Sequence, residues 1–151
     1  MRLNLIKVKP PQVAWLLLAV SVGLHFALPA EYRLDFACRA CGILAFALGF
    51  IMMMWAWWLF RRSSTAIRPA DQASSLITGG PFRFSRNPMY TGMVAMLLGV
   101  AVWLGSWPML IAPVGFFVCM SRVFIPYEEQ RLRDTFGEAY TAYARKVRRW
   151  M

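Results

Sequence analysis

Residues 87–121 read NPMYTGMVAMLLGVAVWLGSWPMLIAPVGFFVCMS, and none of these 35 residues is charged. About 20 apolar residues are enough to cross a hydrocarbon core of about 30 Å, so the stretch is too long for one membrane-spanning helix. Its middle, Gly105–Pro108, combines turn-forming residues with a tryptophan of the kind found at membrane interfaces. The stretch therefore predicts two rather short helices, at about 89–104 and 108–125, joined by a tight turn that lets the chain re-enter the membrane.

Two further uncharged stretches, 10–30 and 40–60, are each 21 residues long and have the length of single spans. The composition agrees, because 59% of all residues are hydrophobic and 16% are charged, against roughly 45–50% and about 25% in soluble domains. These values exclude a soluble enzyme, and the basic residues are too few for a nucleic-acid-binding protein. The sequence predicts a single all-α domain over 1–151, a polytopic membrane protein with four transmembrane helices.

The basic residues are unevenly distributed around the predicted spans. The chain has 17 Lys and Arg against 7 Asp and Glu. The 105–108 turn has no charge, and the loop between the first two spans balances Arg33 and Arg39 with Glu31 and Asp35. The other basic residues, Arg122 apart, flank the spans on the opposite side: Arg2, Lys7, Lys9, Arg61, Arg62, Arg68, Arg83, Arg86, Arg131, Arg133, Arg145, Lys146, Arg148 and Arg149. Because cytoplasmic loops carry an excess of basic residues, we expect a multi-pass protein with both termini in the cytoplasm, in a membrane such as the bacterial inner membrane.

Two predicted cytoplasmic segments, 61–88 and 126–149, offer room for a polar site. The second is expected to be a C-terminal amphipathic helix, because apolar and aromatic residues recur in it every three or four positions. These residues are Leu132, Phe136, Tyr140 and Tyr143. The basic run Arg145–Arg149 is expected to attract anionic lipid, at about 1 kcal/mol per basic residue.

The cysteines and the histidine do not by themselves predict a function. Cys38 and Cys41 have C-x-x-C spacing, and Cys119 lies in the predicted fourth span. A zinc site needs about four ligands, and neither a second cysteine pair nor a nearby histidine supplies the others, so we expect no metal site. We expect the cysteines to be small packing residues, with a redox motif at the outer face as the alternative for Cys38 and Cys41. His25 is expected to be structural.

The segment 78–90, TGGPFRFSRNPMY, combines glycines and prolines with two arginines and three aromatic residues, and is a better candidate for a functional site. Gly79 and Gly80 give backbone freedom, Pro81 stiffens the loop, and Pro88 is well placed to begin a helix. Farther along, Glu128-Glu129 follows Pro126 and places two carboxylates in the first turn of a helix, near the positive end of its dipole. An interfacial anchor loop and simple helix capping are the alternatives that these residues leave open.

Taken together, these motifs resemble the integral-membrane methyltransferases, which include isoprenylcysteine carboxyl methyltransferases and phospholipid N-methyltransferases. The resemblance rests on GPFRFSRNPMY, a helical hairpin, Glu-Glu-x-x-Leu, and then FGEAYTAY over 136–143. It covers about 75–149, half of the chain. It implies S-adenosylmethionine as the cofactor, held between segments 74–90 and 122–149 at the cytoplasmic end of the hairpin.

The resemblance also assigns roles to particular residues. It implies cofactor contacts for Leu76, Ile77, Gly80, Phe82, Asn87, Pro88, Tyr90, Glu128 and Glu129. The chain departs from the family at Asn87, where histidine is commoner; an amide can donate and accept hydrogen bonds but does not titrate. Arg122 lies near the arginine that meets a carboxylate substrate in the prenylcysteine enzymes and is a candidate for substrate positioning.

The implied reaction is methyl transfer to a lipophilic or lipid-linked acceptor, a carboxylate, thiol or amine, with membrane lipids around the protein and no nucleic acid. The identity of the acceptor and the oligomeric state do not follow from the sequence. The alternatives are a membrane reductase of the sterol type, a small four-helix transporter, and an assembly factor without catalysis. A proton-coupled transporter needs an ionisable residue inside its spans, and no acidic residue lies in the four predicted spans.

Overall fold

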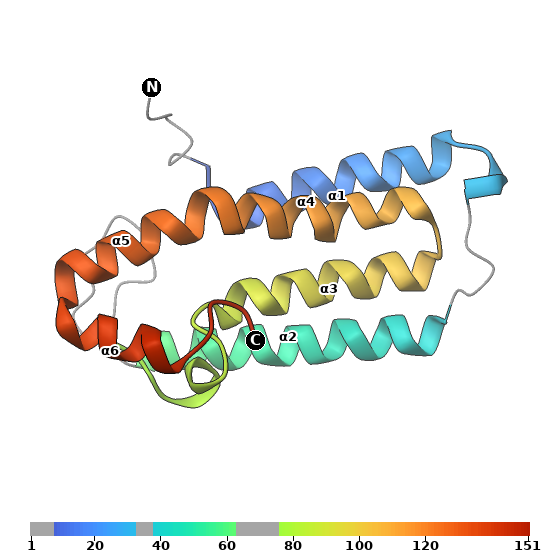
Figure 1. Ribbon diagram of the computed structural model, residues 1–151. Helices are drawn as coiled ribbons and strands as arrows, with labels where there is room; N and C mark the ends of the chain where they lie inside the picture. The colour runs from blue at the N-terminus through green and yellow to red at the C-terminus, as the bar shows by residue number, and fades with distance from the viewer. Residues whose placement is uncertain (1–7, 33–37, 63–75) are drawn as a thin grey trace, which may run out of the picture.

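The computed structural model describes residues 8–32, 38–62 and 76–151, and all regular structure in these ranges is helical (Figure 1). The predicted all-α class is confirmed. The α-helices are α1 Pro10–Ala27, α2 Arg39–Arg62, α3 Pro88–Leu104, α4 Ile111–Cys119, α5 Ile125–Phe136 and α6 Glu138–Lys146. Short 3₁₀ turns, η2 Ala30–Tyr32, η3 Gly80–Arg83 and η4 Trp107–Leu110, and a π-helical segment, η5 Met120–Phe124, complete the described elements.

Within the described ranges, three stretches of helix are long and apolar enough to cross a membrane: α1, α2 and the continuous run from Trp107 to Phe136. The remaining apolar helix, α3, has 17 residues and is shorter. Figure 1 shows α1 lying beside α4, and α2 beside α3, with the long axes of all four roughly aligned. The count of four spans and the re-entrance of the hairpin therefore stay predictions, because α3 is shorter than the three candidate spans.

The turn of the hairpin lies where the sequence predicts it. Gly105 adopts φ +59°, a left-handed conformation that glycine tolerates best, and its N–H donates to the carbonyl of Ala101 to end α3. Ser106, which follows, is buried, and its Oγ lies 2.8 Å from Nδ1 of His25 near the end of α1. This contact ties α1 to the turn and gives His25 the structural role that we expected.

Helices α2 and α3 approach each other through two pairs of glycines. A Cβ added to Gly92 would lie 2.5 Å from the carbonyl oxygen of Gly49, and one added to Gly42 would lie 2.7 Å from that of Gly99. Because lipid provides no hydrophobic force between helices, close van der Waals packing at small residues is a principal source of their association. These glycines fix α2 against α3, whose first turn begins next to the loop 76–87.

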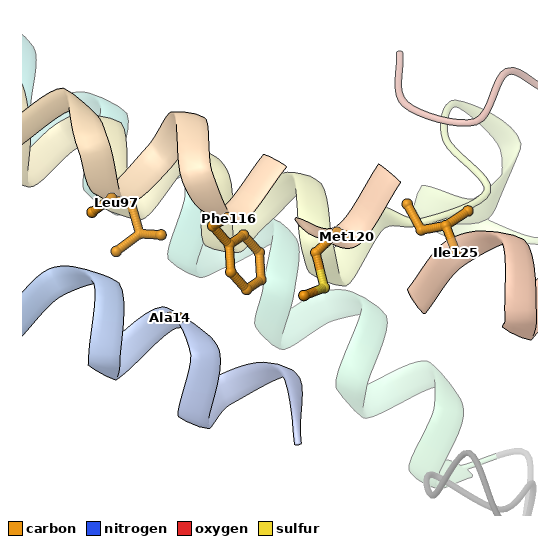
Figure 2. Packing of buried hydrophobic residues seen from close by; sticks show 6 residues of the cluster. Ala14, Leu97, Phe116, Met120 and Ile125 are labelled. Atoms are coloured by element: carbon orange, nitrogen blue, oxygen red, sulfur yellow. The ribbon is translucent and has the colours of Figure 1, made fainter. Parts of the chain in front are cut away.

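The buried core lies between α1, α3 and α4. Ala14 of α1 faces Leu97 and Phe116, and the buried side chains of Met120 and Ile125 continue the row toward α5 (Figure 2). The helix widens here: Ile125 N–H donates to the carbonyl of Met120, five residues back. Pro126 accounts for this, since a proline lacks an N–H and its ring crowds the carbonyl four residues earlier.

The predicted single helix over 126–149 is two helices in the structure. Gly137, with φ +51°, ends α5 and begins α6, and the chain becomes extended at Val147. The prediction was wrong about continuity because the apolar repeat runs through Gly137 without interruption. The break turns α6 and the residues after it back toward the loop before α3 (Figure 1).

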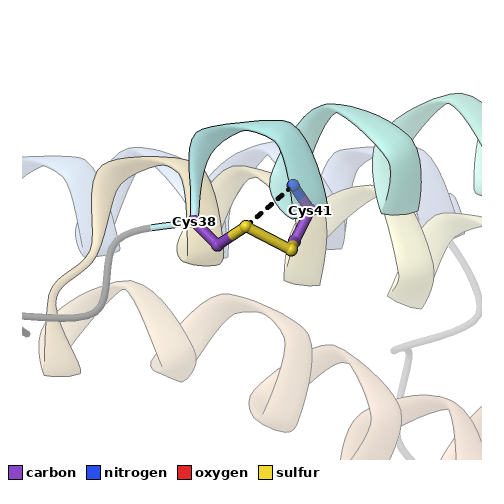
Figure 3. The surroundings of a disulfide bond; sticks show 2 residues. All are labelled: Cys38 and Cys41. Carbon is purple, nitrogen blue, oxygen red and sulfur yellow. Dashed lines mark hydrogen bonds between the residues drawn. A yellow bond between two sulfur atoms is a disulfide. The ribbon is translucent and has the colours of Figure 1, made fainter.

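The packing role predicted for Cys38 and Cys41 is wrong, because the two form a disulfide whose Cα atoms lie 5.2 Å apart (Figure 3). C-x-x-C spacing brings two sulfurs together across one helical turn, so both outcomes were compatible with the sequence. Cys119 carries a free thiol and is partly buried in α4, which agrees with a packing residue.

Gly92→Ala tests the glycine contact. The new methyl group meets backbone at 2.5 Å and must push α2 and α3 apart, so we expect a loss of about 1–3 kcal/mol of unfolding free energy, as for other overpacked sites. Gly23→Ala in α1 is the matched control, because a Cβ there meets nothing within 4 Å. Unfolding in mixed micelles measures both variants, and equal stability of the two would contradict this packing.

Candidate functional site

Polar side chains from four parts of the chain meet at one end of the helices, opposite to the Gly105 turn. The parts are the loop 76–87 with η3, the first turn of α3, helices α5 and α6, and the residues 147–151, which we call the tail. Figure 1 shows the tail running back over the loop. A backbone hydrogen bond of 2.9 Å from Arg86 N–H to the carbonyl of Arg148 fixes this arrangement.

Tyr90 and Glu128 connect α3 to α5. The tyrosine hydroxyl donates to Oε1 of Glu128 at 2.5 Å, and both side chains are partly buried. Among the residues that the structure describes, no hydrogen bond reaches the other oxygen, Oε2. Glu128 therefore keeps one carboxylate oxygen as an acceptor for a bound molecule.

Glu129, its neighbour, is occupied on both oxygens. Only 3% of the residue is exposed, and a carboxylate at such depth requires cations or donors. Arg149 supplies a two-pronged contact, with Nε donating to Oε1 at 3.1 Å and Nη2 to Oε2 at 2.8 Å. Arg86 adds an ion pair at 3.2 Å and Arg133 a longer one at 3.6 Å. Glu128 and Glu129 are therefore the same residue type at adjacent positions but have different surroundings: Glu129 is bound by arginines and Glu128 by Tyr90.

Asn87 joins the start of α3 to the tail. It precedes Pro88, the first residue of α3, and its side-chain Nδ2 donates to the carbonyl of Arg149 at 2.8 Å. Its own N–H donates to Oγ of the buried Ser85 at 3.1 Å. The amide is here a structural donor, a task that a neutral or charged imidazole could also perform.

Gly80 and Phe82 shape the loop in front of α3. Gly80 has φ +57°, and an added Cβ would lie 3.2 Å from Leu59 of α2. Phe82 is buried with its ring 5.2 Å from that of Phe60, and its carbonyl accepts a 2.7 Å hydrogen bond from the hydroxyl of Tyr143. These contacts hold the loop between α2 and α6.

Two tyrosines of α6 complete the cluster. Tyr140 is fully buried and its hydroxyl accepts a hydrogen bond of 3.3 Å from Arg86. Burial, and after it the charge of Glu129, raises the pKa of Tyr140 above its ordinary value. Burial is also the main reason why the pKa of Tyr143 rises to about 12, with Tyr140 contributing. Both hydroxyls therefore stay protonated at neutral pH and serve as hydrogen-bonding groups.

Three predicted residues do not join these contacts. Leu76 and Ile77 are half-buried before η3, and within the described ranges their backbones make no hydrogen bond to α5 or the tail. Arg122 lies exposed in the π-helical segment without an ion pair to the described acidic residues. Residues 74 and 75 of the predicted segment lie outside the described residues. The same is true of five charged residues of the predicted flanks and loops, Arg2, Lys7, Arg33, Asp35 and Arg68.

The tail is the part of the site that sequence reasoning missed. Arg149 was expected to attract lipid, but its guanidinium contacts Glu129. Trp150 anchors the tail next to it: the indole Nε1 donates to Oγ of Ser121 at 3.2 Å, and the ring lies 4.6 Å from that of Phe117. The available signal in the sequence was Trp150, a large aromatic residue directly after the basic run Arg145–Arg149.

Comparison with known proteins places this geometry in context. The family model described as phospholipid methyltransferase matches residues 37–139, more than half of the chain. A probable protein-S-isoprenylcysteine O-methyltransferase of Oryza sativa subsp. indica is 40% identical over 80 residues, which are 51% of this chain and 40% of that protein. Protein-S-isoprenylcysteine O-methyltransferase B of Arabidopsis thaliana is 34% identical over 80 residues, 51% of this chain and 39% of that protein.

A third relative is shorter. An uncharacterized protein of Haemophilus influenzae is 33% identical over 63 residues, which are 42% of this chain and 100% of that protein. The chain thus spans about two fifths of the length of the plant relatives it matches. No solved structure matches the chain.

Arg149→Ala tests whether the tail holds the loop. Removing the two hydrogen bonds to Glu129 should cost about 1.5–3 kcal/mol, the usual range for charged partners, and should loosen the tail. Hydrogen exchange at the Arg86 amide, which donates to the tail, should then become at least tenfold faster. Arg148→Ala is the matched control, since that side chain is exposed. Equal protection of Arg86 in both variants would show that the ion pair does not hold the tail.

Proposed function

Because this chain belongs to the phospholipid methyltransferase family, we propose that it transfers the methyl group of S-adenosylmethionine to a lipophilic acceptor in the membrane. The observation that carries the proposal is the Tyr90–Glu128 contact, which joins the two halves of the sequence motif across the hairpin. Helices α3 and α5 reach this contact from opposite sides of the hairpin, so a cofactor bound there would touch both.

The residues present fit a zwitterionic amino acid. Arg86 has a buried Nε donor that finds no hydrogen-bond partner among the described residues, and in the same part of the chain one carboxylate oxygen of Glu128 accepts no hydrogen bond. A buried donor without a partner, such as Arg86 Nε, is costly unless something satisfies it. The carboxylate and ammonium of the methionine part of S-adenosylmethionine are complementary to these two groups, with ribose hydroxyls as further donors to Glu128.

Glu129, Asn87 and Arg149 act on this arrangement indirectly. Glu129 has no oxygen left for a ligand, since both are bound by arginines. In this proposal it is a positioning residue that fixes Arg86 and Arg149. Asn87 donates to the carbonyl of Arg149 and so keeps the tail closed over the loop. In this proposal the residue at the family's histidine position has a structural role and transfers no proton.

S-adenosylmethionine supplies a methyl group on a positively charged sulfur when it is bound. Displacement at that carbon depends chiefly on alignment, and aromatic faces such as that of Tyr90 suit the neighbouring cation. His25 is held by Ser106 at the other end of the helices, and Tyr143 has a pKa of about 12. We infer that the acceptor arrives already deprotonated, as a carboxylate, a thiolate or a free amine, and that the residues of the site only align it.

The acceptor is proposed to be lipophilic because the plant relatives are named for isoprenylcysteine and the family for phospholipid. The described surface has an apolar groove that could hold such a molecule. A groove of about 230 Å³ between α3 and α4 is lined by Val94, Leu98, Leu110, Pro113, Val114 and Phe117. Val94 lies one helical turn from Tyr90, so the groove leads toward the proposed site. We propose that this end of the protein faces the cytoplasm.

Glu128→Gln tests cofactor binding. The substitution keeps the shape and the acceptor for Tyr90 but removes the charge, and hydrogen bonds to charged groups are worth about 1.5–3 kcal/mol. Calorimetry with S-adenosylhomocysteine should show binding about ten- to a hundredfold weaker than in the unmodified protein. Glu138→Gln, at an exposed position in α6, should bind normally. No binding by the unmodified protein would refute the proposed function, and unchanged binding by Glu128→Gln would refute the role of Glu128.

Cysteine labelling tests the orientation. Ser106 is unsuitable for a probe because it is buried, whereas its neighbour Trp107 is 58% exposed. In intact cells, with the native cysteines replaced, a membrane-impermeant maleimide should label Trp107→Cys and should label Thr141→Cys only after lysis. The reverse pattern would place the site outside the cytoplasm.

A further inference from the structure

The Cys38–Cys41 disulfide lies far from the proposed methyl-transfer site. It sits at the first turn of α2, at the end of the helices where α3 reaches the Gly105 turn (Figures 1 and 3). The glycine contact between Gly42 and Gly99 places this turn beside the last turns of α3. None of the contacts that build the site involves it.

This disulfide contributes little to the fold. It joins residues three positions apart, and disulfides that close short loops remove the least entropy from the unfolded chain. The same turn is already closed by a 2.9 Å hydrogen bond from Gly42 N–H to the carbonyl of Cys38. Helix α2 is held in place by its glycine contacts with α3. A structural clip is therefore redundant at this position.

The surroundings instead favour reactivity. Both cysteines are exposed, so another molecule can approach either sulfur. The N–H of Cys41 points at Sγ of Cys38, 3.3 Å away (Figure 3), and the pair lies at the N-terminus of a 24-residue helix. Backbone donors, the positive end of a helix and a neighbouring cation such as Arg39 all stabilise a thiolate. Each of these favours negative charge on Cys38 once the disulfide opens.

We propose that Cys38 and Cys41 form a thiol–disulfide exchange site on the face opposite to the methyl-transfer site. In the reduced pair, the Cys38 thiolate attacks a disulfide of the partner molecule: a Cys38–partner bond forms and one partner sulfur leaves as a thiolate. Cys41, as a thiolate, then attacks Sγ of Cys38, closes the disulfide and releases the second partner sulfur. Two electrons pass to the partner, whose thiolates take up the two protons given up by the pair, and a partner dithiol reverses the sequence.

The chemistry of the partner is a disulfide or dithiol, carried by either a small molecule or a protein. Two probes separate these sources: glutathione disulfide, and a peptide with one intramolecular disulfide. The proposal is independent of methyl transfer, because neither cysteine contacts the cluster around Glu129.

The test uses the full chain in detergent with Cys119→Ser throughout. Cys41→Ser leaves Cys38 alone, and Cys38→Ser leaves Cys41 alone as the matched control. At pH 7, iodoacetamide should modify Cys38 about tenfold faster than Cys41, the effect of a thiolate favoured by its surroundings. Mass spectrometry should find a mixed disulfide on Cys38 with at least one probe, and the probe that reacts identifies the class of partner. The reduced pair of the Cys119→Ser protein should convert that probe to its thiols.

Equal, slow modification of the two cysteines, or no mixed disulfide with either probe, would overturn the proposal and leave a structural clip. Circular dichroism of each variant checks that α2 and the other helices remain folded. Binding of S-adenosylhomocysteine should be the same in all of them, so failure here is distinguishable from failure of the proposed function.

Discussion

A buried carboxylate, that of Glu129, is the constraint on which this end of the structure depends. At 3% exposure it has lost most of its water, and the charge is tolerable only with cations close by. Three arginines form ion pairs with it, and they come from the loop before α3, from α5 and from the tail. Satisfying one charge therefore closes the tail over the loop and brings Tyr90, Asn87 and Glu128 to one place.

The helices beneath supply rigidity and separation. Glycine contacts hold α2 against α3, and the hairpin turn, anchored by His25, holds α3 against α4 and α1. The first turn of α2, which holds the disulfide, and the first turn of α3, which holds Tyr90 of the polar cluster, consequently lie at opposite ends of the helices (Figure 1). In a membrane, this separation would give one small chain two chemically distinct faces, one arranged around carboxylates and arginines and the other around sulfur.

The features that the sequence predicted are local or carried by a motif. The helices at 10–27 and 39–62 and the turn at Gly105 follow from uncharged length and from turn residues close in sequence. The family motif implied that Tyr90 and Glu128 lie at one site, but it did not predict the hydrogen bond between them. The full set of partners of Glu129 could not be predicted, because Arg133 is one helical turn away but Arg86 and Arg149 are distant in the sequence. The sequence also does not distinguish Glu129 from its neighbour Glu128 as the residue that these arginines bind. Nor could the break at Gly137 be predicted, since periodicity carries no information about a positive φ.

The central claim is that the cofactor binds where the loop, α5 and the tail converge. Chemical-shift mapping of isotope-labelled protein in micelles, titrated with S-adenosylhomocysteine, tests it most directly. The account predicts saturable shifts confined to the amides around 80–90, 128–129 and 147–150, with those near Ser106 and Cys41 unchanged. Shifts centred on the Gly105 turn or along the groove between α3 and α4, or the absence of saturable shifts, would contradict it.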